Sequence, residues 1–277
     1  RDVLGSRGLG DVYKRQALAL TACGGSASTA SSAAASSVAA SSEAASTSAA
    51  AAELTTVEAG KLTMATNATF PPYEMTTDAG TIEGIDVDTA QAIAEKLGLE
   101  LQIDDMDFDA ALLSVQQGKA DIVMAGVTVT DERKAVMDFS DSYATGIQSV
   151  IVPEGSDIAS VDDLAGKKIG TQRGTTGYLY CSDDFGEDAV VAYDNGLTAV
   201  QALNNGQVDA VVIDNEPAKA YVESNPGLKI LDTSYAEEDY AIGMAKGNTA
   251  LEDAVNAALE ELKADGTLQS LSLIHIS

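Results

Sequence analysis

Hydrophobic positions change period along the chain, and strand-like and helix-like patterns alternate from Leu54 onward. Short apolar runs bounded by polar or glycine residues predict β-strands, and amphipathic runs with a period near 3.6 predict helices. The predicted strands are residues 61–66, 99–103, 121–125, 147–152, 168–171, 190–193, 209–213, 228–231 and 239–245. The predicted helices are residues 86–97, 108–117, 131–136, 174–180, 196–203, 216–223 and a last one from Thr249, with a further helix start at 160–163. This alternation predicts an α/β fold with parallel sheets flanked by helices.

The last helix has the clearest local signals. Thr249 and Glu252 have the spacing of a capping box, and Gly266 is expected to end the helix. One apolar stripe runs along it, formed by Leu251, Ala254, Val255, Ala258, Leu259 and Leu262. These features predict a helix that packs one face on the core.

One pattern of helix, glycine and strand occurs twice, in residues 111–124 and 199–212, at an offset of 88 residues (199 minus 111). The repeat predicts two lobes built on one plan. Ligands of open α/β sheets bind beyond the carboxyl ends of the strands. The equivalent strand ends lie at Gly126 and Asp214, so we expect a site between the lobes that both lobes build.

Composition excludes several function classes. With 43 acidic and 16 basic residues the net charge is −27, which argues against a nucleic-acid partner. No run of 18 apolar residues predicts a membrane-spanning helix. The single histidine, His275, lies in a tail set aside below, so we expect no histidine-based catalysis, no metal and no cofactor. The acidic cluster Asp104, Asp105, Asp107 and Asp109 fails the EF-hand pattern, because Ala110 and Gln116 stand where glycine and glutamate are required.

The two ends of the chain are treated separately. Residues 1–16 and 270–277 resemble translated adapter sequence, and residues 270–277 also break the preceding helical pattern. Neither segment enters the fold prediction. Residues 17–23 (ALALTAC) resemble the end of a lipoprotein signal, with Cys23 as the lipid-bearing residue; a chance cysteine in an alanine-rich stretch is the alternative. Residues 24–53 are rich in Ser and Ala and predict a flexible tether. Cys181 is then unpaired and is expected to be a small buried side chain.

Arg133 carries a positive charge where a helix favours a negative one. It lies in the first turn of the helix that Thr130 is expected to cap, where the helix dipole favours acidic residues. One explanation is that Asp131 or Asp138 is its counter-ion. The other is that the guanidinium makes a bidentate hydrogen bond to a small carboxylate ligand.

The second half of the chain offers matching groups. Asp214 follows an apolar strand and either caps the next helix, near Pro217, or binds an ammonium group. Residues 170–177 (GTQRGTTG) form an anion-binding turn or an ordinary glycine turn, and fit no nucleotide-binding motif. Phe70 and Phe108 are either core residues or a clamp over a ligand side chain. A cation from one lobe and an anion from the other match an α-amino acid.

Six segments together resemble the extracellular amino-acid-binding proteins of ABC transporters, in the polar amino-acid group. They are residues 65–74 (ATNATFPPYE), 84–98 (GIDVDTAQAIAEKLG), 116–143, 162–178 (DDLAGKKIGTQRGTTGY), 204–218 (NNGQVDAVVIDNEPA) and 255–268. The resemblance implies a two-lobed clamshell, the type II periplasmic-binding-protein fold, with a mostly parallel sheet in each lobe and two hinge crossovers at 147–152 and 239–245. Lobe 1 would comprise residues 54–148 and 244–269, and lobe 2 residues 149–243.

The resemblance also implies roles for the charged pair. Arg133, with Thr128 and Thr176, would hold the ligand carboxylate. Asp214, with Gly126 and Thr128, would hold the ammonium group. No residue is expected to be catalytic.

Specificity would come from the remaining positions. Phe70 and Phe108 would flank the ligand side chain, and Asn67 and Gln172 match positions that tune its choice. Because Asn67 and Gln172 are neutral, we expect a polar or neutral amino acid, while Glu74 keeps arginine or lysine open.

The expected function is delivery of an amino acid to an ABC permease and its ATPase by open-to-closed switching. We expect a monomer outside the cytoplasm, held to the cell membrane by its lipid. Two other functions stay open: an exported enzyme like the dehydratases of prephenate-like acids, with Glu74 or Asp214 as its acid, and a sensory ligand-binding domain.

Overall fold

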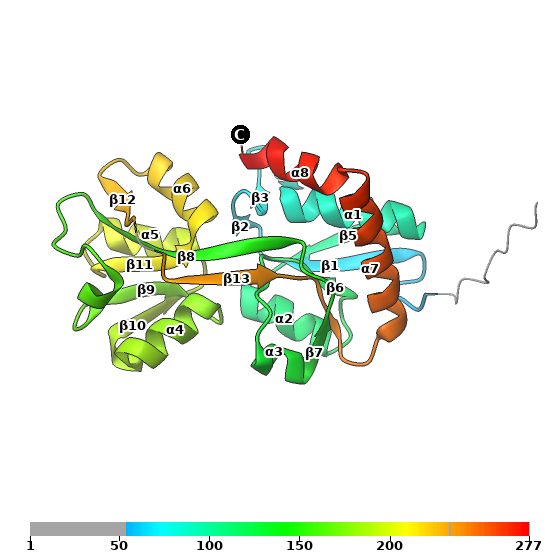
Figure 1. Cartoon of the computed structure of the whole chain (residues 1–277), viewed down its shortest axis with the longest axis horizontal. Coiled ribbons are helices and arrows are strands. Elements are labelled where there is room, and N and C mark those ends of the chain that lie inside the picture. The colour runs from blue at the N-terminus through cyan, green and yellow to red at the C-terminus, as the bar shows by residue number, and fades with distance from the viewer. Residues whose placement is uncertain (1–53, 233, 277) are drawn as a thin grey trace, which may run out of the picture. The chain divides into compact units, whose positions relative to one another are not determined.

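The computed structural model describes residues 54–232 and 234–276, which belong to one compact unit. Within this unit two α/β lobes are connected by β8 (Ala144–Pro153) and β13 (Ala236–Tyr240), which cross from one lobe to the other (Figure 1). The two strands pair in antiparallel register, with Tyr240 opposite Ala144 and Ala236 opposite Gln148. The predicted α/β fold with two lobes and two crossing strands is therefore confirmed.

Lobe 1 is built on a five-stranded sheet of order β5-β1-β6-β14-β7. The strands are β1 (Lys61–Thr66), β5 (Glu100–Asp105), β6 (Ile122–Val123), β7 (Met137–Phe139) and β14 (Gly243–Ala245). Its helices are α1 (Ile85–Leu97), α2 (Phe108–Gln116), α3 (Asp131–Val136), α7 (Thr249–Ala264) and α8 (Thr267–Ile276). A small antiparallel sheet, absent from the sequence prediction, adds β2 (Thr69–Phe70), β3 (Glu74–Thr76) and β4 (Ile82–Glu83).

Lobe 2 is built on a sheet of order β10-β9-β11-β8-β12, to which β13 is added beside β8. Its other strands are β9 (Ile169–Gln172), β10 (Val190–Tyr193), β11 (Ala210–Asp214) and β12 (Leu228–Ile230). The helices are α4 (Thr176–Phe185), α5 (Gly196–Asn204) and α6 (Asn215–Ser224), with short 3₁₀ helices η1 (Val161–Leu164) and η2 (Glu187–Ala189). The sheet of each lobe buries apolar residues under its helices.

The sheets contain less parallel pairing than expected. β1 is parallel to β5 and β6, and β9 is parallel to β10 and β11. The pairs made by β8, β12, β13, β14 and β7 are antiparallel, and β8 and β13 among them are the strands that connect the lobes. The expected single strand 239–245 is in fact two, since the chain leaves the lobe 2 sheet after Tyr240 and enters the lobe 1 sheet at Gly243.

Two predictions near the carboxyl end are corrected. Asn248 rather than Thr249 caps α7, with its side chain accepting a hydrogen bond from the Leu251 amide, so the predicted capping box is wrong. The expected break in helical structure after residue 270 is also wrong, because α8 extends to Ile276 and packs on α1 and α7. Gly266, at φ 80°, lets the chain turn between the two helices.

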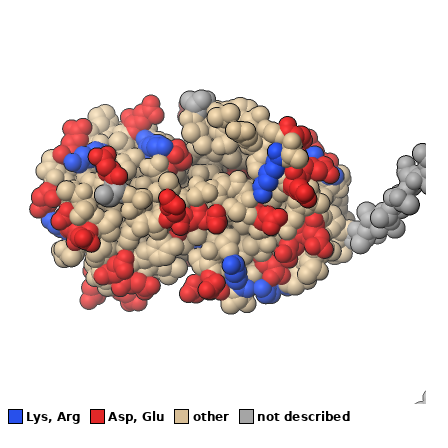
Figure 2. Space-filling model, in the orientation of Figure 1, with Lys and Arg blue, Asp and Glu red and all other residues tan. Residues whose placement is uncertain are grey.

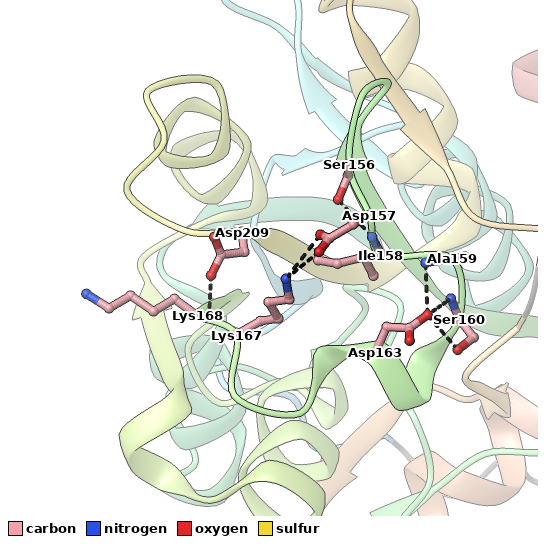
Figure 3. A network of polar contacts seen from close by, with 9 residues as sticks. All are labelled: Ser156, Asp157, Ile158, Ala159, Ser160, Asp163, Lys167, Lys168 and Asp209. Carbon is pink, nitrogen blue, oxygen red and sulfur yellow. Dashed lines mark hydrogen bonds and ion pairs between the residues drawn. The ribbon is translucent and has the colours of Figure 1, made fainter.

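A polar network holds the connection from β8 to β9 in lobe 2 (Figure 3). The Asp163 carboxylate accepts hydrogen bonds from the amides of Ala159 and Ser160, forming a capping box at the start of η1. Lys167 pairs with Asp157 at 3.1 Å. The network fixes the entry into β9, whose other end reaches the candidate site.

Acidic side chains are spread over both lobes on the face shown in Figure 2, and basic side chains are few there. No helix of residues 54–232 and 234–276 has the length and apolar character needed to cross a membrane.

Candidate functional site

The strand ends of the two lobes surround one narrow cavity of about 10 Å³. It is lined by all nine residues that the sequence singles out: Asn67, Phe70, Phe108, Gly126, Thr128, Arg133, Gln172, Thr176 and Asp214. Glu74, Ala125 and Thr175 complete the lining. The residues come from both lobes, as the repeat of the strand ends predicts.

Arg133 reaches the cavity from the first turn of α3. Thr130 caps this helix through its side-chain oxygen, as predicted, at 3.2 Å from the Arg133 amide. The guanidinium is 8% exposed and donates to the carbonyls of Thr128 at 2.7 Å and Gly174 at 3.1 Å. It also lies 5.4 Å from the centroid of the Phe108 ring. Its hydrogen bonds therefore join lobe 1 to lobe 2 across the cavity.

The guanidinium has no carboxylate partner within the described part of the chain. Asp138, one of the two candidate counter-ions, pairs instead with Lys246 at 2.6 Å, and Asp131 is exposed. Burial lowers the pKa of Arg133, and the negative charges of Glu238 and Asp214 oppose this shift. A buried cation without an ion pair is a site for an anion.

Asp214 ends β11 and occupies the N-cap position of α6. Its side chain makes no capping hydrogen bond, so that interpretation of the sequence is wrong. The carboxylate instead accepts hydrogen bonds from Gln148 Nε2 at 2.8 Å and from the Tyr240 hydroxyl. Burial, followed by the nearby charge of Glu238, raises the pKa of Asp214 to about 7. A bound cation would reverse this shift and ionise the group.

Glu238 was missed in the sequence and is part of the same electrostatic group. It is 5% exposed on β13 and accepts a hydrogen bond from Gln148 Nε2 at 2.9 Å, so Gln148 bridges Glu238 and Asp214. The signal was present, because alternate residues of 236–240 point inward along β13. The prediction began that strand at Asp239 and so passed over Glu238.

Side chains also meet directly between the lobes. Gln172 donates from Nε2 to Asn67 Oδ1 at 2.9 Å, and the Tyr221 hydroxyl donates to the Thr69 carbonyl. Asn67 in turn donates to the Met106 carbonyl at 2.8 Å. The two residues expected to tune specificity therefore contact each other across the cavity.

The remaining predicted residues form the walls. Phe70 and Phe108 are 7% and 6% exposed, and they belong to the hydrophobic core and also line the cavity, so their role as a clamp over a ligand side chain stays a prediction. Gly126 has φ 54°, and a Cβ there would lie 2.7 Å from the Phe70 ring, so glycine is required. Thr176 begins α4, whose cap is Thr175.

Glu74 lies on β3 beside these walls and is fully buried. Neither carboxyl oxygen has a hydrogen-bond donor among the described residues. Burial and the neighbouring Asp86 raise the pKa of Glu74 well above its usual range. A carboxyl group in this state is suited to a ligand that brings its own donors.

Comparison with known proteins agrees with this geometry. The model of the bacterial extracellular solute-binding proteins, family 3, matches residues 62–275. The chain belongs to this family.

Individual members of the family support the assignment. A probable histidine-binding protein of Neisseria gonorrhoeae is 34% identical over 257 residues, which are 90% of this chain and 88% of that protein. A putative ABC transporter arginine-binding protein of Escherichia coli K12 is 32% identical over 223 residues, 79% of this chain and 91% of that protein. An ancestral arginine-binding protein, solved with arginine, is 43% identical with a TM-score of 0.75, covering 79% of this chain and 99% of that one. An ancestral arginine-binding protein solved with glutamine is 42% identical with a TM-score of 0.73, covering 78% of this chain and 97% of that one.

These matches show the type II periplasmic-binding-protein fold for this member of family 3. Residues 54–232 and 234–276 contain no cluster of His, Cys, Asp and Glu that suits a metal ion. Cys181 is buried and unpaired there, and burial raises its pKa to about 12. Cys23, the predicted lipidation residue, and the tether lie outside the described residues.

Proposed function

We propose that this protein binds a free amino acid between its lobes and delivers it to an ABC importer. One observation carries the proposal: Arg133 and Asp214, buried and of opposite charge, line one cavity from different lobes and have no ion-pair partner in the described residues. The ligand carboxylate would bind Arg133 with help from Thr128 and Thr176. Its ammonium group would bind Asp214, beside Gly126.

Arginine is our first candidate for the ligand. Its guanidinium would donate hydrogen bonds to the two unpartnered oxygens of Glu74, and its aliphatic stem would lie between Phe70 and Phe108. The arginine-binding relatives support this choice.

Glutamine is the second candidate, and it satisfies the expectation of a polar or neutral ligand. Asn67 and Gln172 line the cavity and offer amide groups to a ligand amide. The Glu74 oxygens, which have no donor in the described residues, would accept from the ligand NH₂ group. The ancestral relative was solved with glutamine as well as arginine.

Binding would work by a shift between open and closed forms. A cavity of about 10 Å³ holds no more than about one water, so an amino acid enters only when the lobes separate. β8 and β13 are the segments that would bend. The lobes meet through few hydrogen bonds, so a ligand that contacts both lobes stabilises the closed form strongly.

The wider setting follows the family and the relatives named above. We propose a monomer that acts outside the cytoplasm with an ABC permease and its ATPase, held to the membrane by a lipid on Cys23. Replacing Cys23 by Ala should release the protein from membranes into the soluble fraction of expressing cells. Retention of that variant on membranes would contradict the anchor.

We propose no catalytic activity. Incubation with prephenate and with arogenate should yield no product, and turnover of either would instead favour the dehydratase-like enzyme. A sensory role without transport would be favoured by a gene neighbourhood that lacks permease and ATPase genes.

A thermal-shift screen tests the proposed function. The twenty amino acids, cystine and ornithine are added singly to the full chain, and positive ligands are then measured by calorimetry. We expect the largest rise in melting temperature with arginine and a smaller one with glutamine. The absence of any shift with all of these compounds would overturn the proposal.

A further inference from the structure

Glu74 and Asp86 form a buried carboxyl pair beneath the ligand cavity. Glu74 lines the cavity and Asp86 lies behind it at the start of α1, and both side chains are fully buried. The Asp86 amide donates to the carbonyl of Tyr73, the residue before Glu74, at 2.9 Å, and Asp86 is the charged group that acts most strongly on Glu74. Two neighbouring carboxylates in so buried a place oppose each other's ionisation, so the pair favours holding one proton between them.

The donors around the pair place this proton. Asp86 accepts through Oδ2 from the Gly126 amide at 3.0 Å and from the Tyr143 hydroxyl at 2.8 Å. Asp86 Oδ1 and both oxygens of Glu74 have no hydrogen-bond donor in the described residues. Asp86 is therefore held as the ionised member, and Glu74 carries the proton that it donates towards Asp86.

Among the described residues, no positively charged side chain acts on Glu74 or Asp86 to neutralise them in place of that proton. The charged and titratable groups whose fields act on Glu74 and Asp86 are acids and tyrosines: Asp105 from β5, Asp214 from β11, Tyr73 beside β3, Tyr143 beside β8, and Tyr221 from α6. Of these, Asp214 and Asp105 raise the pKa of Glu74 further. Asp86, held by two donors, has a pKa raised only to about 6.

We propose that Glu74 and Asp86 share one proton in the ligand-free protein, and that a cationic ligand side chain displaces it. Binding of arginine then releases one proton more than binding of glutamine, because ionisation of Asp214 by the ligand ammonium group is common to both. The O–H bond of Glu74 breaks, its electron pair stays on the carboxylate that faces the guanidinium, and the proton passes to the buffer. Asp86 is the positioning residue that keeps Glu74 protonated until a cation arrives. The displacement step rests on the proposed function, and the shared proton does not.

Infrared spectroscopy tests the shared proton without any ligand. At pH 7 the wild-type protein should show the C=O stretching band of a buried protonated carboxyl group. Glu74→Gln should lose the larger part of this band and keep a remainder from the partly protonated Asp214, and Glu83→Gln, which changes an exposed glutamate of the same small sheet, should keep the whole band. A wild-type spectrum without the band, or a band unchanged in Glu74→Gln, would overturn the proposal.

Calorimetry tests the displacement. Arginine and glutamine are each titrated into the full chain at pH 7 in phosphate and in Tris, which differ strongly in ionisation enthalpy. We expect the difference in heat between the buffers to be larger for arginine than for glutamine by the release of about one further proton, since ionisation of Asp214 contributes equally to both ligands. An equal difference for the two ligands would overturn the displacement and leave the proposed function intact. Failure of arginine to bind at all would overturn the choice of ligand.

Asp86→Asn separates positioning from mere structural support. Its amide oxygen can still accept from Gly126 and Tyr143, while its NH₂ group donates to Glu74 in place of the shared proton. Loss of the Asp86 charge lowers the pKa of Glu74, so the variant should bind arginine with a reduced proton release and show a weakened infrared band. A folded variant that releases as many protons as the wild type would contradict the role of Asp86.

Discussion

Replacing Arg133 by Ala removes the group proposed to hold the ligand carboxylate. In the closed protein this guanidinium is 8% exposed and bonds only to backbone carbonyls, so the ligand would provide its counter-ion. Loss of one partner of a desolvated charge pair costs roughly 2–5 kcal/mol. At about 1.4 kcal/mol per tenfold, affinity should fall by about 30-fold to several thousand-fold.

Two comparisons make this experiment specific. Arg133→Lys keeps the positive charge but lacks the planar guanidinium that donates to the carbonyls of Thr128 and Gly174 together. Its affinity for arginine should therefore lie between those of the wild type and Arg133→Ala. Arg173→Ala removes an exposed arginine that pairs with Asp194 at 3.5 Å, and its affinity should match the wild type. Titration calorimetry with arginine measures all four proteins.

The stability of the ligand-free variant provides the control for folding. Because Arg133 is buried without an ion pair in the described residues, its removal should leave the melting temperature close to that of the wild type. A folded Arg133→Ala protein that binds its amino acid within about threefold of wild type would refute the reasoning, since that is under 1 kcal/mol.

Three further predictions test neighbouring parts of the site. Asp214→Asn should weaken amino-acid binding at least about tenfold in calorimetry, because a neutral amide cannot pair with the ammonium group; equal affinity would remove Asp214 from the site. Gln172→Ala deletes the hydrogen bond between the lobes to Asn67 and should shift the ligand-free protein towards the open form by about 0.5–1.5 kcal/mol. X-ray scattering should then show a larger radius of gyration, and an unchanged radius would contradict this role of Gln172. Asp86 and Asp214 have pKa values of about 6 and about 7 in the folded protein against 3.8 in the unfolded chain, so the folded protein binds more protons between about pH 4 and 7. The free energy of unfolding should therefore fall as the pH rises through this range, by about 3 kcal/mol from Asp86 alone. A rise of this free energy in urea denaturation experiments over the same range would contradict the assignment.

The sequence revealed the residues that break a local rule. Arg133 is conspicuous because a cation is unfavourable in the first turn of a helix, and Asp214 because it ends an apolar strand. Local capping and periodicity also place most helices and strands to within a few residues. These signals need only neighbours in the chain, so they can be read without coordinates.

Contacts between distant segments were beyond such reasoning. Gln148 reaches Glu238 only because β8 and β13 pair in one particular register, 90 residues apart in the chain. Asp86 looks like an ordinary acidic residue in the first turn of a helix, and only the packing of α1 against β3 places it beside Glu74. Burial and partner of an acid are set by the tertiary fold, so its protonation state cannot be read from spacing.

Binding of blocked ligands tests the central claim most directly, because that claim is recognition of both charged ends of one amino acid. Free arginine, Nα-acetyl-arginine and arginine methyl ester are titrated in turn into the wild-type protein. We predict that free arginine binds and that each blocked form, which lacks either the ammonium group or the carboxylate, binds at least about tenfold more weakly. Binding of either blocked form as tightly as free arginine would contradict the account.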